Sequence, residues 1–493
     1  MTNHIYFSDF YNVDPEIIDN YGALDISLLN DLPLFIDPFL IFCSEDPECQ
    51  KLHDEIIKYL VYLRDRAINE EKPSSADLQY LYCFPEVRQT YLGFSLHGNY
   101  GSGLGIQFAS ALHSGLRTSF SDFGNETITK GQHIEKVCLL KEGVGRDNIS
   151  DFITNLIKPY LCEYTQRFAK EYLQPEQCDN FCVAKCCFDY SFGIWKSKTY
   201  YLPKNINEHG IPDYILLTPK DLLVRDTAWI NRQDMIRHFS RFAEAIPDEV
   251  LRDRVNEYFA IQLGKETSRE EREKAVERTL QKFPELLDYY IRHQEDREEE
   301  ALIRNITDVQ GVQFIFIKQL LELVKKLIPL GFYQTKSPAN SYEEAMERVQ
   351  YLKQVIESED GYRYFYDGEN PIRRESDIHL LYKLACCNTI ADTNAEVNNG
   401  RGPVDFKLSN GRKDQTLVEF KLVKTLKNNL LKQVEVYKQA NDHPRSIVVI
   451  IFFTDKEHEK MLKLLNELRL TGMPWIVTID ARKDNKIQAS KAM

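Results

Sequence analysis

The sequence lacks a long apolar run, a leader-like start and paired cysteine motifs. No apolar stretch approaches the ~18 residues that a helix needs to cross a bilayer. Residues 1–10 contain neither the basic segment nor the apolar segment of a secretory signal. The 11 cysteines are odd in number and irregularly spaced, which is typical of reduced thiols rather than of a disulfide framework. We therefore expect a cytoplasmic protein without a membrane partner.

Two clusters come close to ligand-binding motifs without matching one. The glycine-dense segment Gly98–Gly105 has neither the GK[ST] ending of a P-loop nor the GxGxxG spacing of a dinucleotide site. A structural loop is the simpler interpretation, and a nucleotide-sensing loop is the alternative. Cys178, Cys182 and Cys186 have the spacing CxxxCxxxC, which differs from the CxxC pairs of zinc sites. We interpret Val183–Trp195 as a strand with buried cysteines rather than as a metal site.

Length and charge indicate several domains. A chain of 493 residues exceeds what a single hydrophobic core usually organises. From residue 361 onward there are 22 Lys and Arg against 17 Asp and Glu, a net charge of +5, whereas residues 1–360 carry a net charge of −18. A positive net charge suits a domain that binds phosphate groups. The acidic remainder is a poor general surface for nucleic acid.

Two β-prone runs near the carboxyl end predict a hairpin. They are Pro403–Leu408 and Thr416–Val423, and Asn410-Gly411 between them is a strong turn signal. Glu419 and Lys421 are two residues apart in the second run, so their side chains are expected to leave the same face of the strand. A strand-turn-strand unit would bring Asp405 of the first run close to Glu419.

These three charged side chains suit metal-assisted hydrolysis of a phosphodiester. The carboxylates of Asp405 and Glu419, with an open coordination face, suit Mg²⁺, which keeps several waters and takes other ligands from phosphate oxygens. Mn²⁺ is the alternative metal. Lys421 beside them can hold or deprotonate the attacking water and neutralise charge on the phosphate. The competing interpretation is a pair of amphipathic strands with a solvated charged face.

Three motifs resemble those of the PD-(D/E)xK nuclease superfamily, which has the restriction-endonuclease-like fold. They are Pro403-Val404-Asp405, Glu419-Phe420-Lys421, and Gln433 with Tyr437. The first is one residue longer than a strict Pro-Asp, and the second matches ExK. The third matches QxxxY on a helix expected over residues 425–440, where a spacing of four puts both side chains on one face. The resemblance covers roughly residues 361–493, about a quarter of the chain.

The resemblance implies an Mg²⁺-dependent nuclease. Asp405 and Glu419 would bind the metal, Lys421 would act on the water, and Gln433 and Tyr437 would help hold the nucleic acid, with DNA favoured over RNA.

Four further residues are candidates for the same site. The superfamily usually supplies another carboxylate from the first helix or the first strand, and Glu375 and Glu396 are both suitable; we favour Glu375. Glu375 could instead only stabilise the start of its helix. Arg401 and Lys424 are expected to contact phosphate, and ordinary surface charge is the alternative.

The remaining patterns of this region predict an α/β fold. Arg374–Ile390 and Lys456–Leu468 read as amphipathic helices. Ile447–Phe453 is continuously apolar, as expected of a strand buried on both faces, and Pro474–Ile479 reads as another buried strand. The expected order is helix, three strands, helix, strand, helix, strand. This alternation predicts a restriction-endonuclease-like mixed sheet flanked by helices.

The whole chain is expected to have three parts. Residues 1–235 read as a mixed α/β sensor or recognition region, residues 236–360 as a helical connector, and residues 361–493 as the nuclease domain. We leave open whether the connector also forms a homo-oligomer contact. The architecture suggests a nuclease gated by its amino-terminal region and by an unknown activator or partner protein, as in effectors of prokaryotic antiviral defence. The alternatives are a restriction or DNA-repair endonuclease and a catalytically silent nucleic-acid-binding protein.

Overall fold

Two compact units make up the structure, which is a computed structural model. The described residues are 5–70, 72–93, 104–118, 120, 123–139, 146–206, 211–263, 268–333, 340–367, 370–386, 392–394, 406–409, 414–424, 426 and 445–484. Those between 6 and 309 belong to the amino-terminal unit, and those from 310 to 484 belong to the carboxy-terminal unit. In neither unit does a described helix combine the length and the apolar character that crossing a bilayer requires.

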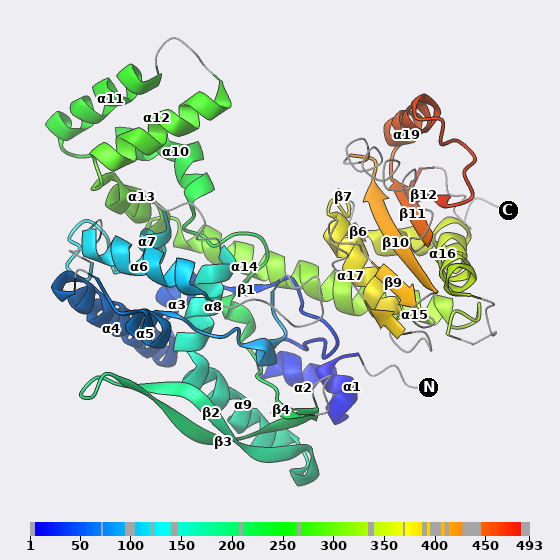
Figure 1. Ribbon diagram of the computed structural model, residues 1–493, viewed down its shortest axis with the longest axis horizontal. Helices are drawn as coiled ribbons and strands as arrows, with labels where there is room; N and C mark the ends of the chain where they lie inside the picture. Colours follow the sequence, from blue (N-terminus) through cyan, green and yellow to red (C-terminus); the bar gives the residue numbers. More distant parts are fainter. Residues whose placement is uncertain are drawn as a thin grey trace. The chain divides into compact units, whose positions relative to one another are not determined.

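The carboxy-terminal unit is built on a mixed five-stranded sheet with the strand order β12-β11-β10-β9-β8 (Figure 1). The strands are β8 Asp392–Asn394, β9 Phe406–Ser409, β10 Gln415–Leu422, β11 Arg445–Phe452 and β12 Ile476–Asp480. Strands β8, β9 and β10 pair antiparallel, whereas β10, β11 and β12 pair parallel. The predicted pairing of the two β-prone runs is confirmed, although Asn410-Gly411 lies outside the described residues. The mixed α/β class that the sequence predicts for this region is also confirmed.

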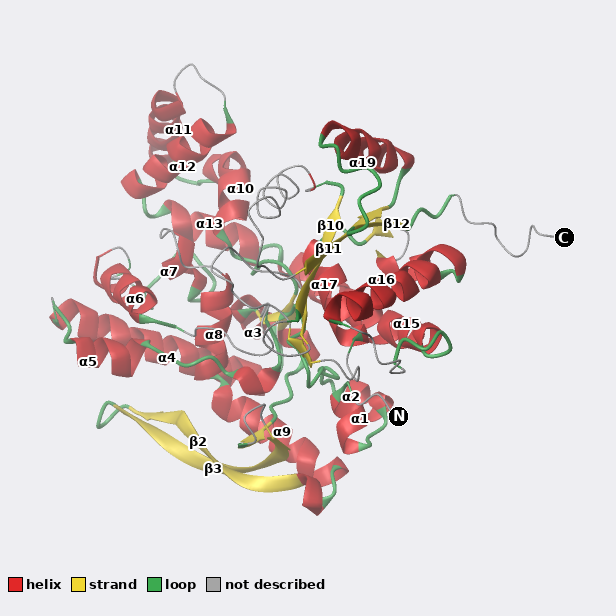
Figure 2. Cartoon of the chain, turned by 45° about the vertical axis from the view of Figure 1, so that its right-hand side comes forward, coloured by secondary structure: helices red, strands yellow, loops and turns green. Residues whose placement is uncertain are grey.

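Helices cover this sheet on both faces (Figure 2). They are α15 Leu320–Leu327, α16 Ser341–Ser358, α17 Glu375–Ala385 and α19 Asp455–Glu467. Two short strands of the same unit, β6 Tyr366–Asp367 and β7 Asn370–Pro371, pair with each other. Phe420 of β10 contacts the Tyr382 ring of α17, with 4.6 Å between ring centroids. On the opposite face, Val448 and Ile450 pack with Met461 of α19 in one apolar cluster. The apolar run of β11 is buried on both faces because each face meets a helix.

Helix α16 belongs to the unit that contains this sheet. It packs on β9, β10, β11 and β12 and on α15. The Ser341 hydroxyl donates to Asp414 Oδ1 at 2.7 Å and lies 2.8 Å from Thr416 Oγ1, which ties the start of α16 to the start of β10. The compact unit therefore begins well before residue 361, where we placed the start of the nuclease domain.

The amino-terminal unit is mainly helical. Its helices are α1 Phe7–Tyr11, α2 Pro15–Asn20, α3 Pro38–Cys43, α4 Pro47–Asn69, α5 Ser75–Asp77, α6 Ile106–Thr118, α7 Glu135–Leu139, α8 Arg146–Leu156, α9 Lys158–Tyr172, α10 Arg232–Glu244, α11 Glu249–Leu263, α12 Arg269–Lys282, α13 Leu286–Glu295 and α14 Glu298–Gln313. Its strands are β1 Phe35–Ile36, β2 Cys178–Asp189, β3 Ile194–Ile206, β4 Pro212–Tyr214 and β5 Leu223–Val224. Helix α14 ends just beyond the boundary between the two units and continues through a π-helical turn, Phe314–Gln319, into α15.

Three of these helices begin with an Asp-Pro pair. Asp14, Asp37 and Asp46 each accept the N–H two residues ahead, and the following proline occupies the first helical position, where its missing N–H costs nothing.

The strand expected over Val183–Trp195 is a hairpin instead. Strand β2 ends at Asp189 and β3 begins at Ile194, and the two pair antiparallel. The Asp189 carboxylate accepts the N–H groups of Ser191 and Phe192 at 2.9 and 3.3 Å, and Gly193 adopts the positive φ of 66° that closes the turn. Because most side chains of this segment are apolar, the sequence pattern predicted a continuous strand and not a turn.

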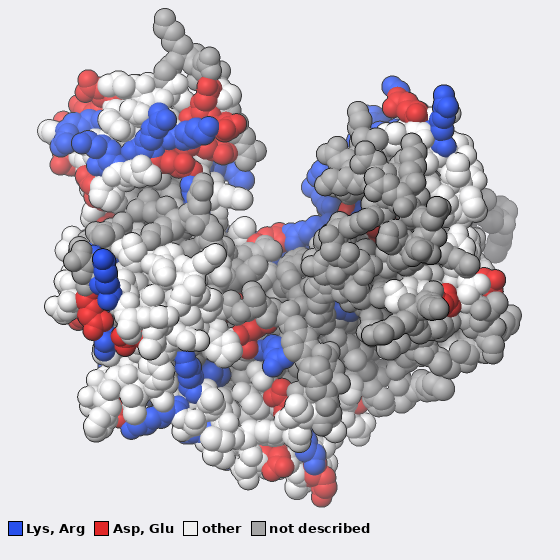
Figure 3. Space-filling model, in the orientation of Figure 1, with Lys and Arg blue, Asp and Glu red and all other residues white. Residues whose placement is uncertain are grey.

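Helices α11 and α12 lie side by side and carry charges of both signs (Figure 3). Lys274 and Glu270 of α12 form an ion pair of 2.8 Å at the spacing i,i+4. Mixed charges of this kind are typical of solvated helix faces.

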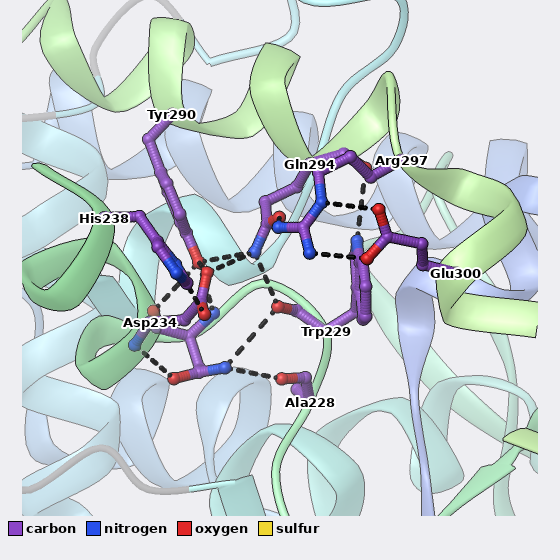
Figure 4. A network of polar contacts seen from close by, with 9 residues as sticks. Ala228, Trp229, Asp234, His238, Tyr290, Gln294, Arg297 and Glu300 are labelled. Carbon is purple, nitrogen blue, oxygen red and sulfur yellow. Dashed lines mark hydrogen bonds and ion pairs between the residues drawn. The ribbon is translucent and has the colours of Figure 1, made fainter. Parts of the chain in front are cut away.

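A polar network joins α10 to α13 (Figure 4). The Gln294 amide donates to Asp234 Oδ2 at 2.7 Å and to the carbonyl of Trp229 at 3.1 Å, and the Tyr290 hydroxyl donates to the carbonyl of Asn231 at 3.0 Å. His238 Nδ1 lies 2.9 Å from Asp234. Because Gln294 and Tyr290 are almost fully buried, each satisfied group avoids the cost of burying a polar atom without a partner.

Two buried carboxyl groups interact electrostatically, Asp37 before the start of α3 and Glu135 at the start of α7. Asp37 accepts the N–H groups of Phe39 and Trp229, whereas neither carboxyl oxygen of Glu135 has a hydrogen-bond partner among the described residues. Burial raises the pKa of Asp37 to about 6, and burial together with the Asp37 charge raises the pKa of Glu135 well above its usual value. Glu135 therefore favours the neutral form in the folded chain, whereas Asp37 becomes ionised above about pH 6.

The free energy of unfolding should consequently decrease with rising pH in this unit. Because the folded-state pKa values are raised, the unfolded chain releases these protons first, and stability is lost between pH ~4 and the folded-state pKa values. Glu135→Gln stays neutral at every pH. At pH 8 we expect its free energy of unfolding to exceed that of the wild type by at least about 1 kcal/mol, measured as a higher melting temperature. We expect this difference to shrink toward pH 5. Glu45→Gln, at an exposed position, is the matched control. A pH-independent difference would contradict this account.

Candidate functional site

The charged face of β10 carries Glu419 and Lys421, as the two-residue spacing predicts. The Lys421 ammonium lies 3.8 Å from Glu419 Oε2. In the parallel register Glu419 and Lys421 are opposite Val448 and Ile450, so both lie on the sheet face that α19 covers. Their neighbours Val418, Phe420 and Leu422 are buried on the other face. The side chains of β10 thus alternate between this charged pair on one face and buried apolar residues on the other.

Glu375, the first residue of α17, joins this pair. Its Oε1 accepts the N–H of Leu422 at 3.1 Å, and its Oε2 lies 3.6 Å from the Lys421 ammonium. The Lys421 side chain, only 10% exposed, therefore lies between two carboxylates whose side chains are 16% and 20% exposed. A cation with so little access to water requires compensating charge.

His379 is a site neighbour that the sequence analysis missed. It lies one turn after Glu375 on α17, and its Nε2 is 3.1 Å from the carbonyl oxygen of Phe420. A carbonyl only accepts, so Nε2 carries the proton. Together His379 and Glu375 bind the Phe420 carbonyl and the Leu422 N–H, the backbone groups on either side of Lys421. The i,i+4 spacing of Glu375 and His379 was the available signal.

Several predicted site residues lie outside the described residues. They are Asp405, Glu396, Arg401, Gln433 and Tyr437. Phe406, the residue after Asp405, pairs with Val418, the residue before Glu419. Lys424 is described and is exposed in the turn that follows β10.

A metal ion at this position would be held by carboxylate oxygens. Over the described ranges, no group of three or more His, Cys, Asp or Glu side chains is arranged to hold a metal ion. Glu375 and Glu419 contribute two carboxylates that flank one ammonium, and carboxylate oxygens are the ligands that Mg²⁺ prefers. The described residues thus place two carboxylates on either side of one ammonium.

Two family models match parts of the chain. Domain of unknown function (DUF8370) matches residues 12–231, and Domain of unknown function (DUF8371) matches residues 341–455, which include Glu375, His379, Glu419 and Lys421. No curated protein and no solved structure matches the chain.

Proposed function

We propose that this protein is a Mg²⁺-dependent nuclease that hydrolyses phosphodiester bonds, with DNA as the favoured substrate. The observation that carries the proposal is the nearly buried Lys421 ammonium held between the carboxylates of Glu375 and Glu419. Asp405 would complete the acidic set. The pairing of Phe406 with Val418 supports this part, since Asp405 directly precedes Phe406 in the sequence and Glu419 directly follows Val418.

Each side chain would have a distinct role. Asp405 and Glu419, with Glu375 beside them, would hold Mg²⁺ or Mn²⁺, which when bound polarises the phosphoryl oxygen and lowers the pKa of a water. Lys421 would orient the attacking water and offset negative charge on the phosphate. Glu375 and His379 would fix the backbone of Lys421, so that its ammonium points at the reacting atoms. Lys424 and Arg401 would bind neighbouring phosphates, and Gln433 and Tyr437 would hold the nucleic acid.

The amino-terminal unit would control access to this site. We propose gating by an activator or partner protein, as in an antiviral effector, because the −18 charge of residues 1–360 makes that part a poor surface for nucleic acid. A circular single-stranded DNA, a plasmid and an RNA, each incubated with the full chain and Mg²⁺, distinguish the substrates and separate endonuclease from exonuclease activity.

Replacing the charged set should abolish cleavage. We expect Asp405→Asn, Glu419→Gln and Lys421→Met each to lower the rate by at least about 100-fold, and a chelator to abolish the wild-type activity until Mg²⁺ or Mn²⁺ is restored. Glu375→Gln keeps an oxygen for the Leu422 N–H but loses the charge, so a large loss in this variant shows that the Glu375 charge is needed, whether for the metal or for Lys421.

Glu459→Gln, at an exposed position of α19, is the matched control for charge and purification. If Glu419→Gln cleaves at the wild-type rate while the same preparation of the control shows no contaminating nuclease, the assignment is overturned.

His379 should act by positioning. His379→Leu removes the donor to the Phe420 carbonyl. We expect kcat to fall by about tenfold with KM nearly unchanged, as for a ring that acts through the backbone beside Lys421 rather than on the substrate. His379→Gln can donate from its amide and should recover most of the rate. His458→Leu on α19, which removes a histidine that stacks on Phe452, is the control. Equal losses in His379→Leu and His379→Gln would contradict a role through this hydrogen bond.

Gln433 and Tyr437 should affect substrate binding more than chemistry. If both face the nucleic acid, Gln433→Ala and Tyr437→Ala raise the Kd for uncleaved substrate measured in Ca²⁺, and Tyr437→Phe raises it less because the ring is kept. Unchanged binding in Gln433→Ala would show that the QxxxY match is accidental.

A further inference from the structure

Strand β12 is the outer strand at one edge of the five-stranded sheet. Among the described strands it pairs only with β11, in parallel, and the N–H of Val448 donates to the carbonyl of Trp475 at 2.8 Å. Within a strand, the N–H and the carbonyl of one residue point to the same side, and alternate residues point to opposite sides. Ile476, Thr478 and Asp480 therefore direct their backbone groups away from β11.

This edge has the composition of a strand that pairs readily with another chain. The segment from Trp475 to Ile479 is apolar apart from one threonine and contains neither a charged residue nor a proline. Exposed backbone groups along such a segment are a template for a further strand, and folded proteins usually cover or charge their sheet edges to prevent this pairing. The groups that cover the β12 edge therefore have a function of their own.

Two side chains of α16 bind the outward backbone groups of β12. The Lys353 ammonium donates to the carbonyl of Thr478 at 2.5 Å, and Glu357 Oε1 accepts the N–H of Asp480 at 2.8 Å. The two side chains also form an ion pair of 3.3 Å. Their spacing matches the strand, because four residues of helix rise about 6 Å and two residues of strand rise about 6.6 Å. The pair thus occupies positions where a further strand would donate and accept hydrogen bonds.

Helix α16 does not depend on this pair for its place on the sheet. Its residues Leu352, Val355 and Ile356 are buried, whereas the side chains of Lys353 and Glu357 are 31% and 26% exposed. An ion pair with this exposure contributes little to the free energy of unfolding. The contribution of the pair is therefore to be sought in its contact with the backbone of β12.

We propose that Lys353 and Glu357 close this edge against pairing with β12 of a second copy of the chain. Two identical strands pair most simply in the antiparallel direction, about a two-fold axis. With Thr478 at the centre, Ile476 of each copy would lie opposite Asp480 of the other, so that no like charges are directly opposite. The edge is thus complementary to itself, and the two side chains of α16 keep it unpaired.

The mass of the full chain in solution tests the proposal. The double variant Lys353→Ala with Glu357→Ala removes both bonds to β12 and adds little apolar surface. We expect its weight-average mass in sedimentation equilibrium to rise with protein concentration toward about twice the wild-type value. Gln350→Ala with Gln354→Ala is the matched control, because both glutamines are exposed on the same helix at the same spacing. The control should keep the wild-type mass at every concentration.

A proline in β12 separates strand pairing from other association. Thr478→Pro, added to the double variant, removes an N–H that faces away from β11 and so blocks a further strand. The mass should then return to the wild-type value, while circular dichroism shows that the fold is kept.

The single variant Lys353→Ala frees only the Thr478 carbonyl and should also gain mass with concentration, to a smaller extent. It decides the question if the double variant does not fold. A folded variant that keeps the wild-type mass at every concentration would overturn the proposal. Association that persists with the proline, or that the glutamine control shows equally, would overturn it as well.

Discussion

The Lys421 ammonium is the constraint on which the organisation of the carboxy-terminal unit depends. A side chain that is 10% exposed at the end of a central strand cannot rely on water for its charge. The sheet supplies Glu419 two residues away, and α17 supplies Glu375 at its first residue. Helix α17 must therefore begin beside the end of β10, where Glu375 reaches Leu422. The hydrogen bonds of Glu375 and His379 to the backbone on either side of Lys421 keep it there.

Buried cations in the amino-terminal unit follow the same rule with different partners. The Lys136 ammonium lies 3.2 Å from Glu126 and 2.7 Å from Asp288, so two carboxylates compensate it. Glu295, fully buried, accepts the N–H groups of Lys130 and Gly131 and lies 2.9 Å from His133 Nε2. Lys158 differs, because it is 5% exposed and burial lowers the pKa of its ammonium.

Local patterns predicted those parts of the fold that local physics determines. The alternation of β10 and the apolar run of β11 identified strands, because the period of side chains follows directly from backbone geometry. The β2–β3 turn was missed, since its Phe192 is apolar although the Asp189 side chain organises the bend. This error arose where one polar side chain outweighed the hydrophobic pattern.

The candidate site was predictable only where its residues are neighbours in sequence. Glu419 and Lys421 share a strand, so their spacing was enough; Glu375 comes from a helix more than forty residues earlier, and only a resemblance suggested it. His379 required tertiary structure, because its partner is a backbone carbonyl, and its i,i+4 spacing from Glu375 does not identify that partner. The same reasoning explains the domain boundary. Ser341 binds Asp414 and contacts Thr416, so α16 completes the sheet, and the matched family model likewise begins at residue 341. The structural unit that contains the candidate site therefore extends well beyond the sequence motifs from which the site was predicted.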